Sequence, residues 1–437
     1  MKKPYPFQVQ AVRQALEAPG FLIADECGLG KTITAIEIIK AARTKYGSTG
    51  PWRSLVVCPP SLILQWTDTI EDQDPDRTIV VPGRVPYNYT SVDGYVVMTY
   101  YDFLHAPTRA GLGGLIWDCM ILDEAHRIKN RKAKTTVYIK QIQAARKVAL
   151  TGTPMEKSPT DLWSILNFFD PYEFPAYWAW VMENLYVTAG YFEQFVVGAP
   201  KHPEAFGNIL KPYMIRRTKE EVAPALPEKI LIEEHVAMTE KQQAIYDQLK
   251  KSTDIEVQVE DKTLLIQNVL ALITKLQQVS SFPPLLGLSA DSGKMNWLKD
   301  FLDDHKGEPT VIFTRFRNSA IHLADTLGCG LIIGGERREV GDTGLLVGTI
   351  DAMGEGLNLQ WAKHAIFIDS HWSTIKMTQA IDRIHRIDIK EPKNIYLLWS
   401  TKEDRLVLDA LDHKWSESEM VYYYLNQPVE VPNNQAD

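Results

Sequence analysis

Cysteine is scarce in this chain, and its distribution excludes the commonest cysteine-based sites. The 437 residues include four cysteines, Cys27, Cys58, Cys119 and Cys329, and no C-x-x-C pair. A zinc site built on paired cysteines is therefore not expected. Cys58 and Cys119 lie within apolar runs, so we predict that they are small core residues in a reducing compartment.

Long apolar runs and an excess of basic charge are lacking as well. No apolar run approaches the roughly 18 residues that a membrane span needs. The first ten residues, MKKPYPFQVQ, have no apolar stretch after the lysines, so no secretory signal is predicted and an intracellular protein is expected. The formal net charge of −8 excludes nucleic-acid binding through overall charge, but it leaves room for a local basic groove.

Short apolar runs indicate two α/β lobes. Such runs alternate with turn-forming or helix-like stretches, which is the pattern of buried parallel strands. The first series is FLIAD, SLVVC, YVVMT, CMILD and KVALT, and the second is TVIFT, GLIIG, GLLVGT, HAIFID and NIYLLW. Because the chain is too long for one ordinary core, we expect two domains of doubly wound α/β type.

The region between the two series differs in composition. Residues 155–213 are rich in Trp, Tyr, Phe and Pro, and residues 238–282 have helix-like spacing, as in MTEKQQAIYDQLKK and TLLIQNVLALITKLQQV. The aromatic residues could stack on bases, but the favoured interpretation is that they pack helices on the first lobe. Residues 426–437 lack apolar periodicity and are predicted to be loose.

The stretch ADECGLGKT has the strand–loop–helix context of a phosphate-binding loop, although Asp25 stands where the usual pattern has glycine. Gly28 and Gly30 would let backbone N–H groups turn toward phosphates, and the helix that follows adds partial positive charge. Lys31 would reach the β- and γ-phosphates, and Thr32 would bind Mg²⁺.

Two further motifs supply charged groups that phosphate chemistry needs. In WDCMILDEAHRIKN, Asp123 and Glu124 follow an apolar strand, where Asp123 would hold Mg²⁺ and Glu124 would polarise the attacking water. The alternative is a helix cap with solvated charges. In QAIDRIHRIDIK, Arg383 and Arg386 are three residues apart and would share one helix face, the alternative being a solvated basic helix.

Taken in order, these motifs resemble the Swi/Snf-related ATPases of helicase superfamily two, the DEAH-containing double-stranded DNA translocases, from about residue 4 to residue 410. PYPFQVQAV resembles the Q motif, DECGLGKT motif I, SLVVCPPSLILQW motif Ia, YVVMTYYDFL motif Ib, ILDEAHRIKN motif II and ALTGTPMEKSPTDLWSILNFFDP motif III. MIRRTKEEVAPALPEK is similar to the family's link between lobes, and TVIFTRF, VGTIDAMGEGLNLQWA and QAIDRIHR resemble motifs IV, V and VI. An acidic residue at position 25 is usual in this family.

The resemblance implies an α/β fold of two RecA-like doubly wound parallel-sheet lobes with helical insertions between them. The expected first lobe covers residues 1–225, and the expected second domain, residues 226–425, combines a helical protrusion with the second lobe. ATP would bind between the lobes.

The resemblance also implies roles for individual residues. The catalytic residues would be Lys31, Glu124, Arg383 and Arg386. ATP would be bound by Gln8, Gly28, Gly30, Lys31, Thr32, Gly356 and Gln379, and Mg²⁺ by Thr32 and Asp123. The residues coupling ATP to DNA would be His126, Thr151 and Thr153, and the DNA-backbone contacts would be Ser61, Thr99, Thr314, Arg315 and Thr349. The basic run RIKNRKAK either flanks the duplex or is a solvated loop.

Three departures from the family pattern concern DNA contacts and coupling. The segment between GGER and LLVGT is short, IDIK follows Arg386 in place of the usual Gly-Gln, and HWST replaces Trp-Asn-Pro. The chain has no bromo-, chromo-, SANT-like or RING-like segment, which disfavours a nucleosome remodeller.

We therefore expect an ATP-driven motor that translocates on double-stranded or branched DNA, of the fork- or junction-remodelling or branch-migration type. Its DNA contacts would be to the backbone and independent of sequence. The alternatives are an RNA helicase and a nucleotide-switched DNA-binding scaffold with little turnover. We expect ATP and Mg²⁺ as ligands, a monomer without membrane contact, and the cytoplasm of a prokaryote or of a virus-infected host in preference to a nucleus.

Overall fold

The structure is a computed structural model of the chain. It describes residues 3–47, 50–83, 88–155, 158–189, 195–251, 256–259, 262–265, 269–289, 291–339, 341, 343–354, 357–371, 373–401, 404–405 and 408. The predicted loose tail, 426–437, lies outside the described residues. The chain divides into two compact units, of which the first includes Met1–Pro224 and the second covers Ala225–Lys414. Among the described residues, no helix combines the length and the apolar character needed to cross a membrane.

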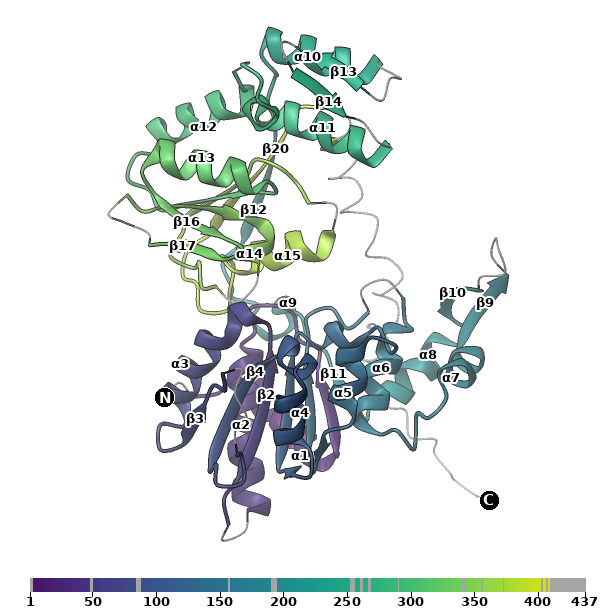
Figure 1. Cartoon of the computed structure of the whole chain (residues 1–437). Helices are drawn as coiled ribbons and strands as arrows, with labels where there is room; N and C mark the ends of the chain where they lie inside the picture. Colours follow the sequence, from purple (N-terminus) through teal and green to yellow (C-terminus); the bar gives the residue numbers. More distant parts are fainter. Residues whose placement is uncertain are drawn as a thin grey trace, which may run out of the picture. The chain divides into compact units, whose positions relative to one another are not determined.

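The first unit is built on a seven-stranded parallel sheet with the order β11–β1–β8–β6–β2–β4–β3 (Figure 1). Its strands are β1 (Gly20–Ile23), β2 (Arg53–Cys58), β3 (Thr78–Val80), β4 (Gly94–Thr99), β6 (Cys119–Asp123), β8 (Lys147–Leu150) and β11 (Met214–Ile215). All five strands predicted for this lobe are present. The edge strands β3 and β11 were not predicted, because three and two residues are too short to show periodicity.

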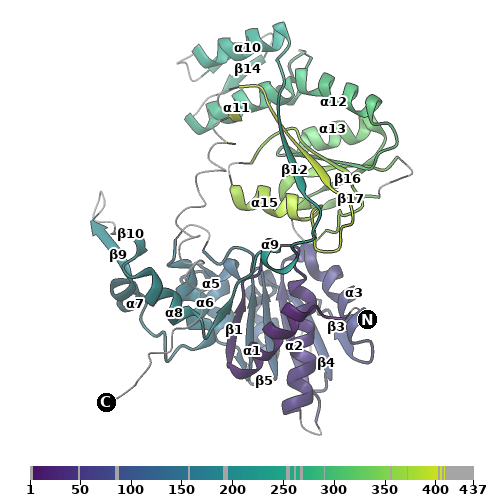
Figure 2. The ribbon, with the colours of Figure 1, turned by 180° about the vertical axis from the view of Figure 1, so that it is seen from behind.

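Helices cover both faces of this sheet, since side chains alternate across a strand. In β2, Val56 and Cys58 pack in the cluster that contains helices α1 to α3, whereas Leu55 and Val57 pack in the cluster that contains α4 to α8. Figure 2 shows the unit from the opposite side to Figure 1. These helices are α1 (Pro6–Glu17), α2 (Lys31–Tyr46), α3 (Ile63–Gln73), α4 (Ala106–Leu112), α5 (Lys134–Lys140), α6 (Asp161–Phe169), α7 (Tyr177–Asn184) and α8 (Pro203–Leu210). Burial of Cys58 and Cys119 confirms that they are core residues.

The aromatic-rich region packs on the first sheet, as the favoured interpretation predicts. Trp163, Phe168, Trp180 and Phe206 are buried in one of its two cores. The region also forms an antiparallel hairpin, β9 (Leu185–Ala189) with β10 (Phe195–Pro200), that the sequence did not indicate. The remaining short elements are η1 (Pro60–Leu62), η2 (Tyr100–Leu104), η3 (Ala125–Ile128), β5 (Ile116–Trp117), β7 (Gln143–Ala144) and α9 (Lys219–Val222).

The second unit contains a seven-stranded sheet with the order β12–β20–β19–β15–β18–β16–β17, in which only the β16–β17 pairing is antiparallel. Its strands are β12 (Lys229–His235), β15 (Thr310–Thr314), β16 (Gly330–Ile333), β17 (Glu336–Arg338), β18 (Leu345–Thr349), β19 (His364–Phe367) and β20 (Lys393–Trp399). Helices α12 (Gly293–Asp304) and α13 (Arg317–Leu327) cover one face, and α14 (Ile350–Met353) and α15 (Thr374–Asp382) cover the other. The predicted fold class, α/β with two lobes built on parallel sheets, is confirmed.

A helical insertion lies between β12 and α12. It consists of α10 (Glu240–Lys251), α11 (Val269–Ser281), η5 (Pro283–Leu286) and an antiparallel hairpin of β13 (Glu256–Val259) and β14 (Lys262–Leu265). The helix-like interpretation of TLLIQNVLALITKLQQV is therefore wrong at its start, because Leu264 and Leu265 pair with Val257 and Glu256 in a ladder. A few apolar residues at the first positions of a helical pattern fit a strand as well as a helix.

Candidate functional site

The stretch ADECGLGKT connects β1 to α2 at the carboxyl edge of the first sheet. Gly28 (φ +88°) and Gly30 (φ +78°) are in the left-handed region that favours glycine. Gly30 is the N-cap of α2, which begins at Lys31. The Lys31 ammonium donates to the backbone carbonyls of Asp25 at 2.9 Å and Glu26 at 3.3 Å. A helix N-terminus and a lysine thus meet in one glycine-containing loop, an arrangement suited to a phosphate group.

Asp25, at the position of the missing glycine, is held by Arg217. The Nε of Arg217 donates to Oδ1 of Asp25 at 2.9 Å, and Nη2 donates to Oδ2. The same guanidinium donates to the carbonyl of Phe7 and lies 4.9 Å from the centre of the Phe7 ring. The Asp25 side chain is 1% exposed and that of Arg217 is 10% exposed. This buried bidentate pair, through the same guanidinium, ties the phosphate loop to the first turn of α1.

Gln8, the predicted adenine-binding residue, lies against the same loop. Its Nε2 donates to the carbonyl of Leu29 at 3.1 Å and of Gly30 at 3.3 Å. Its Oε1 accepts from the backbone N–H of Tyr5 at 2.9 Å. The side chain is buried, so it supports the loop, and its role toward adenine stays a prediction.

The segment MIRRTK runs beside the phosphate loop. Arg216 donates to the carbonyl of Ala24 at 2.7 Å, and the backbone N–H of Lys219 donates to the Glu26 carboxylate at 2.8 Å. The backbone N–H of Glu26 donates to the carbonyl of Arg217 at 2.9 Å. Our sequence reasoning identified this segment only as a link between lobes. The unusual acid in the loop was the one signal that it needs a basic partner.

Asp123 is the last residue of β6, and its carboxylate is already oriented. Oδ2 accepts from the indole N–H of Trp66 at 2.8 Å, and Oδ1 accepts from the backbone N–H of Glu124 at 2.9 Å. Burial, and then the negative charge of Glu124, raises the pKa of Asp123 above its ordinary value, whereas the Trp66 bond and the charge of Lys31 oppose this. A divalent cation would offset the charge of two buried carboxylates. The oxygen donors of Asp123 and Thr32, the second residue of α2, therefore fit Mg²⁺.

Glu124 has an unusual backbone. Among the described residues it is the one non-glycine residue with positive φ, at +51°, and it is 5% exposed. Such a conformation is unfavourable for most residues and often marks a functional site. The Nδ1 of His126 lies 3.3 Å from a Glu124 carboxylate oxygen and 3.3 Å from the hydroxyl of Thr151, which accepts from the N–H of Thr153 at 3.2 Å. The structure thus brings the three predicted coupling residues into one chain of contacts with Glu124.

The predicted helix carrying Arg383 and Arg386 ends earlier than expected. Helix α15 stops at Asp382, so the two arginines do not share a helix face and that prediction is wrong. The Nε of Arg383 donates to the carbonyl of Gly354 at 2.8 Å, and its own carbonyl accepts from the N–H of Leu359. These tertiary contacts fix a turn in place of another helical turn. Arg383 is buried, whereas Arg386 is half-buried.

The other predicted residues of this unit are placed as follows. Gln379 is buried on α15, and Gly356 lies outside the described residues. The roles of these two residues toward ATP stay predictions. Nearby, the Nε2 of His385 lies 2.7 Å from the carbonyl oxygen of Pro227.

Two predicted DNA-binding residues lie at neighbouring strand ends of the first unit. Ser61 is exposed in η1, directly after β2, and Thr99 ends β4, the strand that pairs with β2. The Thr99 side chain caps η2 and donates to Asp102 at 2.8 Å. In the basic run, Arg131 lies 4.2 Å from the centre of the Tyr177 ring, while Lys132 and Lys134 are exposed.

The other three predicted DNA-binding residues lie at strand ends of the second unit. Arg315 and Thr349 line a pocket of about 480 Å³ at the ends of β15, β16 and β18. Arg317 also lines it and was missed by sequence reasoning, since one arginine at a helix start is common. Thr314 is fully buried and donates to Asp369 at 2.5 Å, a placement that favours support of its neighbours over direct contact with DNA.

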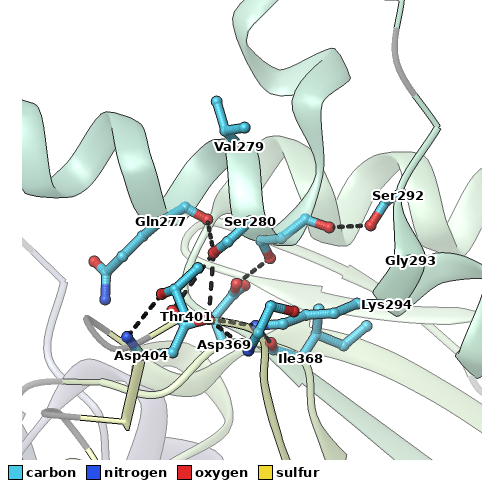
Figure 3. Close-up of polar contacts among 12 residues, drawn as sticks. Gln277, Val279, Ser280, Ser292, Gly293, Lys294, Ile368, Asp369, Thr401 and Asp404 are labelled. Atoms are coloured by element: carbon cyan, nitrogen blue, oxygen red, sulfur yellow. Dashed lines mark hydrogen bonds and ion pairs between the residues drawn. The ribbon is translucent and has the colours of Figure 1, made fainter. Parts of the chain in front are cut away.

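Asp369, which accepts the hydrogen bond from Thr314, belongs to a buried polar network (Figure 3). The network joins α11, α12 and the segments that follow β19 and β20. Asp369 follows β19 and also accepts a hydrogen bond from Ser281, the last residue of α11. Lys294 of α12 donates to the carbonyl of Ile368 at 3.0 Å and to the carboxylate of Asp404 at 3.1 Å. The network therefore connects α11 and α12 to the strand end that positions Thr314.

Comparisons with known proteins give two family matches and several similar proteins. Residues 8–285 match the family model of the SNF2-related domain, and residues 293–388 match that of the helicase conserved C-terminal domain. An uncharacterized ATP-dependent helicase of Mycoplasma genitalium is 27% identical over 427 residues, which cover 89% of this chain and 39% of that protein. The SWI/SNF-related matrix-associated actin-dependent regulator of chromatin subfamily A member 1 of Mus musculus is 25% identical, with coverages of 88% and 40%.

A solved structure is similar as well. The SWI2/SNF2 ATPase core of Sulfolobus solfataricus in complex with dsDNA is 22% identical, with a TM-score of 0.45, over 98% of this chain and 95% of that one. The chain spans about two fifths of the length of the curated relatives that it matches.

Proposed function

The chain belongs to the SNF2-related family, and from this premise we propose that it is an ATP-driven motor that translocates on double-stranded or branched DNA. Within that class we propose the fork- or junction-remodelling or branch-migration type. The observation that carries the proposal is the meeting of a glycine-containing loop, the N-terminus of α2 and Lys31 with the buried pair Asp123 and Glu124. Phosphoryl chemistry needs a cation cradle and an oriented base, and both are built into one sheet edge.

In this proposal each residue of the first unit has one task in ATP hydrolysis. Lys31 leaves the loop carbonyls and binds the β- and γ-phosphates. Mg²⁺, when bound through Thr32 and Asp123, neutralises charge on the phosphate oxygens. Glu124 accepts the proton of the attacking water, and its left-handed backbone turns the carboxylate out of the line of β6. His126 contacts both Glu124 and Thr151, so it couples that carboxylate to the loop after β8.

We propose that the guanidinium of Arg386 neutralises the negative charge on the γ-phosphate. The Nε of Arg383 donates to the carbonyl of Gly354 and so holds the turn that precedes half-buried Arg386, while the predicted catalytic role of Arg383 stays a prediction. An arginine in this role contributes a factor of about 10³–10⁵ in rate.

DNA would be gripped through its phosphates, because a motor must be indifferent to sequence. The pocket of Arg315, Arg317 and Thr349 offers two guanidinium groups and a hydroxyl at one strand edge. Asp351 also lines it, which limits the net positive charge to one unit and favours a single phosphate over a longer acidic segment.

The first experiment is phosphate release by the whole chain with three variants. Lys31→Ala is expected to lose both ATP binding and turnover, because the cradle loses its ammonium. Glu124→Gln is expected to bind ATP with unchanged affinity and to lose turnover by at least about 10²-fold, since only proton acceptance is removed. Thr44→Val, on the exposed part of α2, is the control and should leave both unchanged. Normal turnover in Lys31→Ala would contradict the assignment.

The second experiment compares nucleic acids as activators of turnover. Linear duplex, fork, four-way junction, single-stranded DNA and RNA are tested, together with displacement of a third strand from a triplex as the measure of translocation. Stimulation by duplex or branched DNA with displacement of the third strand supports the motor. Stimulation by RNA alone would favour an RNA helicase, and binding without turnover would favour a nucleotide-switched scaffold.

The pocket arginines give a prediction of their own. Arg315→Ala and Arg317→Ala should each weaken DNA affinity to a similar degree on unrelated sequences and lower the salt dependence of binding, because phosphate contacts carry no sequence information. ATP turnover without DNA should be unchanged. Arg109→Ala, in the first unit and stacked on Tyr138, is a charge-matched control. A loss confined to one DNA sequence would contradict a phosphate contact.

A further inference from the structure

Three side chains of metal-binding type meet at the amino end of the second sheet, the opposite end from Thr314 and Thr349. His305 follows α12, Glu308 precedes β15, and His364 is the first residue of β19. One ligand atom from each residue, two imidazole nitrogens and one carboxylate oxygen, lies within 4.8 Å of the others. They come from three separate segments of the chain, so the cluster is a product of the fold and not of a local motif.

The contacts of the two imidazoles suit ligation through Nε2. The Nδ1 of His305 lies 3.0 Å from the carbonyl oxygen of Phe301 and can donate to it, which leaves Nε2 for another partner. The Nε2 of His364 lies 2.5 Å from Oε2 of Glu308, and its Nδ1 lies 3.5 Å from the side-chain amide of Asn394. Metal-binding histidines are commonly oriented in this way, by a carbonyl or amide at the other nitrogen. The Asn394 amide can present its oxygen to Nδ1–H after a half-turn.

Aromatic side chains surround the cluster on its inner side. The ring of Phe301 stacks on His305 with centres 4.1 Å apart and meets the edge of His364 at 5.3 Å. The ring of Tyr396 lies 6.0 Å from that of His364. His364 is 2% exposed, whereas Glu308 is 33% exposed. The cluster is therefore dry on one side and open to water at the carboxylate.

We propose that His305, Glu308 and His364 bind a divalent transition-metal ion of the zinc class, with water as the fourth ligand. Two imidazoles and a carboxylate form a known tetrahedral zinc ligand set, while Mg²⁺ and Ca²⁺ prefer oxygen ligands throughout. The site is separate from the Mg²⁺ residues of the first unit. Bound metal would fix the end of α12 to the first residues of β15 and β19.

Lys363 provides the sharpest test, because its ammonium pairs with the other oxygen of Glu308. If the cluster is only an ion-pair network, Lys363 is part of what holds it together. If the cluster binds metal, the ammonium competes with the cation for the charge of Glu308. Lys363→Ala should then tighten metal binding.

The experiment is a zinc titration of the chelator-treated whole chain against a chromophoric zinc indicator, with a parallel cobalt spectrum to report tetrahedral coordination. We expect one zinc ion per chain and at least about tenfold weaker binding in His305→Gln and in His364→Gln. His322→Gln, an exposed histidine of α13, is the matched control and should bind like the parent. Zinc should raise the melting temperature of the parent and not of His305→Gln.

Two results would overturn the proposal. One is the absence of zinc binding by both the parent and Lys363→Ala, which would leave an ion-pair network. The other is undiminished binding in both histidine variants, which would place the ion elsewhere. Lys363→Ala alters an exposed side chain, so this arm remains decisive even if His364→Gln does not fold.

Discussion

At residue 25 an aspartate replaces a loop glycine, and its partner shows how the loop accommodates it. Arg217 bonds the carboxylate through two nitrogens and the backbone of Phe7 through a third. Both side chains are almost fully buried, so water could not take the place of either partner if it were removed. The single guanidinium thereby fixes the phosphate loop, the first turn of α1 and the segment after β11.

We predict that Arg217→Ala lowers the free energy of unfolding by about 3–5 kcal/mol, because it leaves the Asp25 carboxylate buried and unpaired. ATP affinity should fall as well, since the loop loses its hold on Phe7. Urea unfolding and nucleotide binding measure the two effects. Arg77→Ala, which breaks a surface pair with Asp93, should cost less than about 1 kcal/mol. Equal losses in the two variants would argue against a special role for Arg217.

The local part of the site is predictable from the sequence, and the long-range part is not. Lys31 begins the helix after the loop that follows β1, and Glu124 stands directly after β6, so the context of each is visible within about ten residues. Arg217 is 192 residues from Asp25, and the sequence around either residue gives no signal that the two form a pair. For Arg383, helical periodicity continues past Asp382, but the helix ends there, where Arg383 makes tertiary contacts with Gly354 and Leu359 that the sequence does not show.

Among the elements, α11 and α12 are joined to the second sheet by charge as well as by apolar contacts. Lys294, on α12, has a side chain that is 1% exposed, and Asp404 is its ion-pair partner after β20. Burial raises the pKa of Asp369, and the charge of Lys294 is the largest influence that lowers it. The Lys294 ammonium thus donates to the Asp404 carboxylate and to the carbonyl of Ile368, and its charge also stabilises the ionised Asp369 carboxylate.

We predict that Lys294→Met lowers the free energy of unfolding by about 3 kcal/mol, because two buried carboxylates lose their cation. The double variant Lys294→Met with Asp404→Leu should lose less than the sum of the two single variants, since no unpaired charge of the pair remains. Denaturant unfolding measures all three. Lys299→Met, on the exposed side of α12, should change stability by less than about 0.5 kcal/mol. Strict additivity in the double variant would contradict the ion-pair account.

Element types followed the apolar pattern except where elements are short or lie at an edge. All ten strands predicted by buried runs are present, because a strand covered on both faces must be apolar along its length. The edge strand β12, KILIEEH, pairs along its full length with β20 yet is mostly exposed, so its residues carry no continuous apolar signal. The start of the stretch TLLIQNV was taken for helix because a few apolar residues fit a strand as well as a helix.

At the scale of the whole molecule, each unit has hydrophobic clusters of its own, and the described residues form two in the first unit and three in the second. Domains with separate cores commonly unfold in separate steps. We predict two calorimetric transitions for the intact chain. Arg217→Ala should lower the midpoint of one transition, and Lys294→Met should lower that of the other.

The same measurement can assign each transition. A non-hydrolysable ATP analogue with Mg²⁺ should raise the transition that Arg217→Ala lowers, because a ligand stabilises the unit that binds it. A single transition that both variants shift equally would show that the units unfold together and would contradict separate cores.

The contact between Arg217 and Asp25 also sets an order of events during synthesis. The phosphate loop leaves the ribosome early, while β11 and the guanidinium that complete its surroundings follow 192 residues later. Until then β1 lacks one neighbour, and the loop carboxylate stays hydrated in the nascent chain. In a chain stalled before residue 217 the phosphate loop would lack this partner, and we predict that such a chain retains ATP less well than the finished first unit.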